Sequence, residues 1–446
     1  MIDRTTIAAI STAYGYGGIG VIRISGAKVK KLMRHFFGKE LKPRLAFYKR
    51  IKTSNDEILD STVCIFFKGP SSYTGEDLLE IHTHGNPIIM ESILEVIFSQ
   101  GVRPATPGEF TERAFINNKL NLTQAEAVSD LIYSSSIASV KAANASIQGV
   151  FSDQISLLSD KLLTTRAKIE ASIDFPEDDI PESTKKETSL ILNEVISLCE
   201  NLVESAKSGI KMNEKHTYCV VGQPNAGKSS LVNSLIGNNA SIVSSIPGTT
   251  RDSLQYDIRI NDYLVSIIDT AGLRQTSDEI EIEGIERTKM AIQRSQRVLY
   301  VVDDSIGFTE KDKTILKNFS ISDYDLVFNK IDLSGSKAGI KNSNINSIYI
   351  SIKENLGMKN LTDFLIKSNV GGKEGEVPAS ARVRHLNNAN LALDSLYTAK
   401  KYNDNQELEF VAEELKNAYN HLVAILGTDV SEKLLDEIFS KFCIGK

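Results

Sequence analysis

The chain has 446 residues and a formal net charge of −6, which predicts two or three domains and argues against an indiscriminate polyanion binder. No apolar run reaches the length of a membrane span, and the N-terminus lacks the basic-then-apolar pattern of a signal peptide. The four cysteines are scattered, without a C-x-x-C pair, so we expect reduced thiols in a cytoplasmic protein with no membrane contact.

Residues 1–118 combine short alternating apolar runs with glycine and proline turns, which predicts an α+β domain. Within them, Gly15–Gly20 satisfies the dinucleotide pattern G-x-G-x-x-G. The run Val21–Ser25 that follows alternates like a strand and offers no helix N-terminus to a pyrophosphate. We therefore interpret the glycines as a turn that a partner or ligand approaches closely.

The segment Lys28–Lys52 holds ten Lys and Arg residues against one acid, Glu40, and several aromatic residues are interleaved with them. Two interpretations stay open for this segment: a solvated face, or a patch that contacts RNA.

Glu80, His82 and His84 alternate along one predicted strand and so share a face. They resemble a metal set, but the three residues span about 14 Å and could not converge on one ion without a bend. A ligand-facing carboxylate is the better interpretation of Glu80.

Two separate segments, 119–211 and 379–446, carry helical periodicity. The apolar stripes are Ile191, Val195, Leu198 and Leu202 in the first, and Leu408, Val411, Leu415, Ala418, Leu422 and Ile425 in the second. Neither segment has a second apolar layer of its own. The pattern therefore predicts one discontinuous helical domain, with the α/β domain 216–370 inserted into it.

The inserted domain begins with the phosphate-loop pattern G-x-x-x-x-G-K-[ST] at Gly222–Ser229, between a predicted strand and a predicted helix. Backbone N–H groups of such a loop converge on phosphate oxygens, and the helix dipole favours them. We expect Lys228 to reach the β- and γ-phosphates and Ser229 to hold Mg²⁺. The nucleotide contacts expected here are Asn225, Ala226, Gly227, Lys228, Ser229 and Ser230.

Two further tetrapeptides close strands of this domain, and we expect both to contact the nucleotide. They are Asp269, Thr270, Ala271 and Gly272, then Asn329, Lys330, Ile331 and Asp332. A carboxylate at Asp332 can accept two hydrogen bonds from the N1–H and N2–H₂ edge of guanine. Adenine lacks this donor pair and would leave the carboxylate unpaired. The order of the motifs predicts a doubly wound GTP-binding domain.

Thr250 lies where the first switch belongs and is the expected second hydroxyl ligand of Mg²⁺. Leu273 occupies the position at which small GTPases place a water-orienting glutamine, so hydrolysis needs another group. An acidic cluster that includes Glu281 follows, and Asn225 offers an amide oxygen to a bound cation.

The tail Cys443–Lys446 has the outline of a prenylation box, but its last two residues do not fit one, and we reject lipidation. The thiol beside a terminal amine and carboxylate is chemically interesting, although a bare C-terminus is usually frayed.

Motifs along the whole chain resemble the MnmE (TrmE) family of tRNA-modification GTPases. They are Tyr14–Gly26, Ser72–Asp77, Arg103–Phe115, Ala171–Pro176, the inserted GTPase domain and Phe442–Lys446. The resemblance implies a homodimer whose N-terminal domain binds a formyl- or methylene-tetrahydrofolate. The matching folate contacts are Arg23, Glu80, Lys119 and Lys446.

The resemblance further implies a heterotetramer with MnmG (GidA), a partner that carries FAD. Together they install a carboxymethylaminomethyl or aminomethyl group on carbon five of the wobble uridine of tRNA. Cys443 is a candidate nucleophile toward carbon six of that uridine, and the partner could equally supply one.

In the same family, GTPase domains dimerise around a K⁺ that replaces an arginine finger. The implied K⁺ ligands are Asn225, Ser244, Ile246 and Thr249, and Glu281 would position the hydrolytic water. Lys228, Thr250 and Glu281 are the catalytic candidates, and the switch adds nucleotide contacts at Ser244, Ser245, Ile246, Pro247, Gly248, Thr249 and Thr250. Two departures from the family pattern are Gln223 and Ile352. The second could loosen guanine affinity.

Two rivals from other classes remain: a ribosome-assembly switch and a scaffold with vestigial nucleotide binding. A ribosome factor would carry a basic RNA-binding module after its GTPase domain. Here residues 403–446 are acidic to neutral and helical in pattern.

Overall fold

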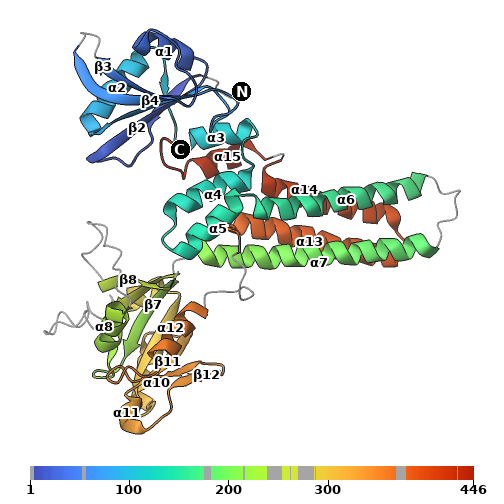
Figure 1. Cartoon of the computed structure of the whole chain (residues 1–446). Helices are drawn as coiled ribbons and strands as arrows, with labels where there is room; N and C mark the ends of the chain where they lie inside the picture. The colour runs from blue at the N-terminus through green and yellow to red at the C-terminus, as the bar shows by residue number, and fades with distance from the viewer. Residues whose placement is uncertain are drawn as a thin grey trace. The chain divides into compact units, whose positions relative to one another are not determined.

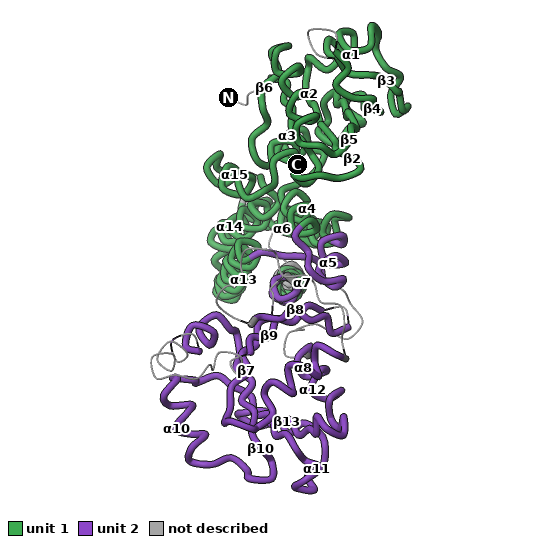
Figure 2. The backbone as a smooth tube through the Cα atoms, turned by 90° about the vertical axis from the view of Figure 1, so that its left-hand side faces the viewer, with its two compact units in different colours: residues 1–132, 146–203, 383–446 green, residues 133–145, 204–382 purple. Residues whose placement is uncertain are grey.

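A computed structural model describes residues 5–52, 57–174, 182–213, 216–238, 254–261, 263–269, 286, 288–367, 378–428 and 430–446. The chain divides into two compact units (Figure 2). The first contains residues 1–132, 146–203 and 383–446, and the second contains residues 133–145 and 204–382. Among the helices in the described part of the chain, none is long and apolar enough to cross a bilayer.

The first unit begins with a six-stranded sheet in the order β3-β4-β5-β2-β1-β6. Its neighbours pair antiparallel, except β1 and β6, which are parallel. The strands are β1 (Ile7–Ile10), β2 (Gly17–Ser25), β3 (Ala46–Lys52), β4 (Ile58–Phe67), β5 (Leu78–Gly85) and β6 (Arg103–Pro104).

Helices α1 (Val29–Phe37) and α2 (Pro87–Ser99) cover one face of this sheet, and α3 (Glu109–Ile116) follows β6. Ile22 of β2 and Ile81 of β5 belong to the core that α1 and α2 close. Because side chains alternate along a strand, their neighbours Arg23, Glu80 and His82 face the other side. The α+β expectation is confirmed, and a strand does follow the glycine-rich turn.

The first unit also contains most of a helical bundle, in which α6, α7, α13 and α14 run side by side (Figure 1). Segments on both sides of the inserted domain build it, as expected. The helices of these segments are α4 (Leu122–Tyr133), α5 (Ile137–Ile147), α6 (Val150–Asp174), α7 (Glu182–Asn213), α13 (Val383–Asp404), α14 (Leu408–Leu426) and α15 (Glu432–Phe439). Most of α5 and the end of α7 belong to the second unit.

The second unit contains a seven-stranded sheet in the order β12-β13-β11-β10-β7-β9-β8. The five central strands are parallel, and β8 and β12 add antiparallel edges. The strands are β7 (His216–Gly222), β8 (Leu254–Ile260), β9 (Tyr263–Asp269), β10 (Arg297–Asp303), β11 (Tyr324–Asn329), β12 (Gly339–Lys341) and β13 (Ser347–Tyr349).

Helices pack on both faces of this second sheet. Residues of α8 (Lys228–Asn238) and α12 (Met358–Lys367) join one core, and α10 (Glu310–Asn318) contributes to the other. A short helix, α11 (Ile331–Ser334), follows β11. The predicted fold class, a multidomain chain with an inserted doubly wound α/β domain, is confirmed. The finer boundaries near residues 118, 211 and 379 stay predictions.

Candidate functional site

The loop between β7 and α8 has the backbone of a phosphate-binding loop. Asn225 and Gly227 both have positive φ, 65° and 102°. A Cβ on Gly227 would lie 2.2 Å from Nδ2 of Asn329, so only glycine fits there. Lys228 begins α8 with a buried side chain, and its Nζ donates to the Gln223 carbonyl at 2.7 Å. Gln223 itself donates through Nε2 to Oγ1 of Thr309, also in the second unit.

Asn329 ends β11 and ties this loop to the loop after β13. Its Nδ2 donates to the Ala226 carbonyl at 3.0 Å, and its Oδ1 accepts from the Ile352 N–H at 3.3 Å. Ser351 in turn donates through its hydroxyl to Oδ1 of Asp332 at 2.6 Å. The expected guanine-binding residues are therefore held in one hydrogen-bonded frame with the phosphate loop.

Lys330 adopts a left-handed conformation, with φ of 68°, and extends to the end of β10. Its Nζ lies 2.5 Å from Oδ2 of Asp303. Burial alone would raise the pKa of Asp303, but hydrogen bonds from Lys330 and Ser305 outweigh it and lower that pKa. This ionised pair fixes the stem of Lys330 along one wall of the site.

These loops enclose a cleft of about 750 Å³, within the range that nucleotide-sized ligands occupy. The predicted residues that line it are Asn225, Gly227, Lys228, Ser229, Ser230, Asn329, Lys330 and Asp332. Ala226 and Ile331, which neighbour lining residues in the sequence, are buried, and so is Asp269 at the end of β9. The cleft is also lined by Pro224, Leu333, Ile352 and Lys353.

The switch and the segment after β9 lie outside the described residues. This concerns the predicted contacts Ser244, Ser245, Ile246, Pro247, Gly248, Thr249, Thr250, Thr270, Ala271, Gly272 and Glu281.

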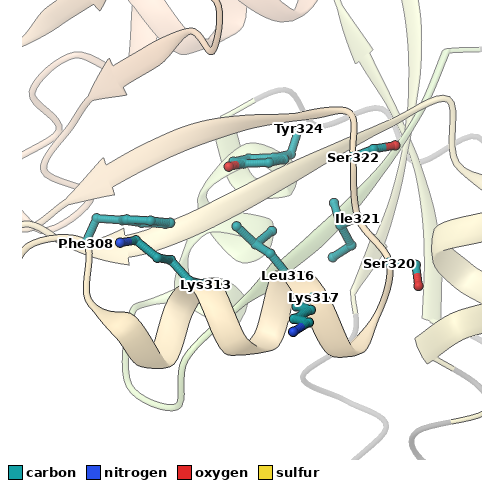
Figure 3. A pocket seen from close by; sticks show the side chains of 8 residues that line it. All are labelled: Phe308, Lys313, Leu316, Lys317, Ser320, Ile321, Ser322 and Tyr324. Carbon is teal, nitrogen blue, oxygen red and sulfur yellow. The ribbon is translucent and has the colours of Figure 1, made fainter.

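A second cavity, of about 570 Å³, lies between α10 and the start of β11 (Figure 3). Leu316 and Lys313 of α10 and Tyr324 of β11 line it. None of the predicted site residues that the structure describes contributes to it.

Arg23 and Glu80 form a second site, on the open face of the first sheet, because they are direct partners across β2 and β5. Nε and Nη2 of Arg23 lie 3.1 and 2.9 Å from Oε1 of Glu80. The other carboxylate oxygen lies 3.3 Å from Nε2 of His82. Nη1 of Arg23 donates to the Gly445 carbonyl at 3.4 Å, so the C-terminal tail reaches this site.

Two aromatic residues that sequence reasoning missed frame the guanidinium of Arg23. Its carbon lies 5.5 Å from the Tyr73 ring centre and 5.8 Å from that of Phe110. Both belong to motifs that carry the family resemblance, but only the fold shows that they meet at Arg23. Lys446 is half-buried, and burial together with the nearby Arg23 lowers its pKa.

The tail docks through its backbone. Phe442 is buried, the Cys443 carbonyl accepts from the Gly108 N–H at 3.3 Å, and the Cys443 side chain is exposed. Lys119 is also exposed, and no hydrogen bond or cation–π contact among the described residues joins it to Arg23 or Lys446.

His84 turns away from the metal set considered above. Its Nδ1 lies 2.7 Å from Oδ1 of Asp60. No group of three or more metal-ligating side chains is found within the described ranges.

Comparison with known proteins gives full-length matches. Residues 6–119 match the family model "GTP-binding protein TrmE N-terminus", and residues 122–443 match "MnmE helical domain". The tRNA modification GTPase MnmE of Francisella tularensis subsp. novicida is 42% identical over 454 residues, with both chains covered completely. That of Francisella philomiragia is 42% identical over 455 residues, again with full coverage.

Among solved structures, Aquifex aeolicus Era is 22% identical and covers 42% of this chain and 65% of its own, with a TM-score of 0.28. A similarity of that size carries no argument about function.

Proposed function

The chain belongs to the MnmE (TrmE) family of tRNA modification GTPases, and on this basis we propose that it hydrolyses GTP to support chemistry on the wobble uridine of tRNA. The product would carry a carboxymethylaminomethyl or aminomethyl group on carbon five. We propose that the chain works as a homodimer, in the cytoplasm, in a heterotetramer with the FAD protein MnmG.

One observation carries the nucleotide part of this proposal: the phosphate loop and the Asn329–Asp332 segment line the same cleft. The Asp332 carboxylate would accept from the guanine edge while Ser351 orients it. Lys228 would place its charge on the β- and γ-phosphates after leaving the Gln223 carbonyl.

Oxygen donors at the cleft fit a Mg²⁺ ion. Ser229 lines the cleft at the first turn of α8, and a hydroxyl suits this hard cation. We propose Ser229 and Thr250 as its ligands. Bound there, Mg²⁺ would neutralise phosphate charge.

Asn225 also fits a cation site. It has a left-handed backbone conformation and lines the cleft, as does Gly227 of the phosphate loop. We propose that its amide oxygen holds K⁺, together with Ser244, Ile246 and Thr249. The cation would replace an arginine finger. Glu281 is proposed to position the hydrolytic water.

The site on the first sheet is proposed to bind the tetrahydrofolate derivative. A half-buried guanidinium and ammonium, Arg23 and Lys446, suit the carboxylates of a folate tail. Glu80 suits the amino edge of a pterin. Lys119 joins this set only by its match to the family, and Cys443 remains a candidate nucleophile.

The test is nucleoside mass spectrometry of total tRNA from cells that lack this gene. We expect the aminomethyl-type wobble uridines to disappear, and to return with the wild-type gene but not with Glu281→Ala. An unchanged nucleoside profile would contradict the tRNA role and turn attention to ribosome assembly.

The cation proposal has its own measurement. GTP hydrolysis by the purified chain should be faster in KCl than in NaCl at equal ionic strength. Asn225→Ala should remove that difference and leave basal hydrolysis measurable. Equal rates of the wild type in both salts would contradict the K⁺ site.

A further inference from the structure

The basic segment Lys28–Lys52 maps to α1 and the edge strand β3 in the first unit. Ten cationic side chains and one acid in this segment contrast with the net charge of −6 of the whole chain. A tRNA is a polyanion, so an acidic protein that acts on it needs a local surface of this sign.

Part of this charge is used within the fold. Lys30 pairs with Asp77 at 3.4 Å, and Arg34 pairs with Glu40 at 2.5 Å. Arg44 donates to the Ser71 carbonyl, and Lys28 to that of Gly101. These four cations have structural partners and are not the basis of the inference.

Lys49 and Arg50 of β3 differ from them. Within the described part of the chain, the side chain of neither residue makes an ion pair or a hydrogen bond. Side chains alternate along a strand, so the two cations emerge on opposite faces of the sheet edge. Positive charge therefore surrounds the edge.

A cavity of about 1200 Å³ opens beside this edge. Tyr48, Lys49, Arg50 and Lys52 of β3 line it with His35 of α1, and Glu95 of α2 is its one carboxylate within the described ranges. The volume of this cavity exceeds that of the nucleotide cleft, about 750 Å³.

Tyr48 gives the surface a second feature, because 64% of this large aromatic residue is exposed, on the same face of β3 as Arg50. An exposed ring next to Lys and Arg can stack on an unpaired base while they contact phosphates. An acidic peptide would use the cations but not the ring, so RNA fits the surface better.

We propose that the edge of β3, centred on Tyr48, Lys49 and Arg50, binds the backbone and an unstacked base of the tRNA substrate. This inference rests on the proposed role in tRNA modification. A competing explanation is that lysines on an edge strand only prevent sheet-to-sheet aggregation.

The test compares tRNA binding by the wild-type full chain and by Lys49→Gln/Arg50→Gln across a range of salt concentrations. The probe is an unmodified tRNA transcript with a wobble uridine, followed by fluorescence anisotropy. The association constant K falls as salt rises, and losing two phosphate contacts should make the slope of log K against log salt less negative by about 1.4 to 1.8. Binding at low salt should weaken. Tyr48→Leu should weaken binding without changing the slope.

The matched control is Lys401→Gln/Lys433→Gln, which removes two exposed cations of the same unit elsewhere. It should bind like the wild type, and both double variants should keep wild-type GTP hydrolysis. An equal loss of tRNA affinity in the control, or an unchanged salt slope in the test variant, would contradict the proposed tRNA-binding surface. Aggregation of the test variant with normal tRNA affinity would assign the cations to edge protection instead.

The two proposals can fail separately. Normal tRNA binding by the test variant, with wobble modification still lost on gene deletion, would reject only the surface. Weakened binding without any change of nucleosides on gene deletion would reject the modification role and leave an RNA-binding edge.

Discussion

Asn329 joins the two loops of the nucleotide cleft, through the Ala226 carbonyl and the Ile352 N–H. In Asn329→Ala the Ala226 carbonyl loses a buried hydrogen bond and the Ile352 N–H a partly buried one, so we expect GTP affinity to fall about tenfold to a hundredfold. Titration with a fluorescent GTP analogue measures this. The control Asn346→Ala removes a bond to Asp325 away from the cleft and should leave affinity unchanged. An equal loss in both variants would contradict the assigned role.

The four cysteines should differ sharply in reactivity. Burial raises the pKa of the Cys64 thiol to about 11, and that of Cys199 and Cys219 to about 12. Cys443 is exposed. We expect iodoacetamide to label Cys443 first in the native protein at pH 8, and the other three only after denaturation. Peptide mass spectrometry reads the order, and early labelling of Cys64 would contradict it.

Much of the nucleotide site was predictable at the scale of residues, because strand ends of a parallel sheet meet at one edge. The structural role of Asn329 was not, since its tetrapeptide pattern indicates base recognition and says nothing about ties between loops. Tyr73 and Phe110 were likewise missed. They meet Arg23 only through the fold, and no periodicity reveals such a contact.

At the scale of elements, helix α10 begins with a capping box formed by Thr309 and Asp312, and the protonation of Asp312 affects the stability of the helix. Oδ2 of Asp312 accepts from the N–H and hydroxyl of Thr309 at 2.8 and 2.7 Å, and Oδ1 accepts from Tyr300 at 2.9 Å. Burial alone would raise the pKa of Asp312, but these hydrogen bonds lower it overall. The unfolded chain then binds more protons. The stabilisation is complete above an unfolded pKa of about 3.9 and is lost as pH falls through the lower folded pKa.

Asp312→Asn should therefore destabilise α10 by about 1 kcal/mol at pH 6 and by less below pH 3. Hydrogen exchange of the α10 amides, measured by mass spectrometry at both pH values, gives the comparison. Asp323→Asn, an exposed acid of the same unit, serves as the control. A difference that does not shrink in acid would refute the pH effect.

The apolar stripes predicted in α7 and α14 show how well periodicity alone identifies the buried residues of a helix. In α14 the predicted positions from Val411 to Ile425 are all buried. In α7, Ile191 and Leu198 are only half-buried, and the neighbouring Leu192 and Cys199 are buried instead. Because α7 packs in a bundle, its buried face is wider than one stripe, and the packing partners decide which residues are central.

For the first unit as a whole, periodicity did not predict that the C-terminal tail docks beside β1; only the family resemblance, which put Lys446 among the folate contacts with Arg23, implied it. Gly445 makes this possible. Its φ is 91°, and a Cβ there would lie 2.2 Å from the Ile10 carbonyl oxygen. Such a close approach depends on the complete fold, so a short tail in isolation reads only as a frayed end.

Gly445→Ala should therefore release the tail from β1. We expect faster hydrogen exchange in the peptide that contains Gly108, because its N–H donates to the Cys443 carbonyl of the docked tail and that bond opens. GTP hydrolysis should stay unchanged. Gly18→Ala, at a position with no heavy atom within 4 Å of the added Cβ, is the matched control. Wild-type exchange in Gly445→Ala would show that the tail docks without this glycine.

Because the bundle is discontinuous in sequence, its helices leave the ribosome at different times. Helices α6 and α7 emerge before the inserted domain, whereas α13 and α14 follow about 180 residues later. At about 5–20 residues per second, the apolar faces of α6 and α7 wait roughly 10–40 s for their partners. The buried side of α7 is therefore a natural substrate for nascent-chain chaperones, and the bundle of the first unit is completed only after α13 and α14 have emerged.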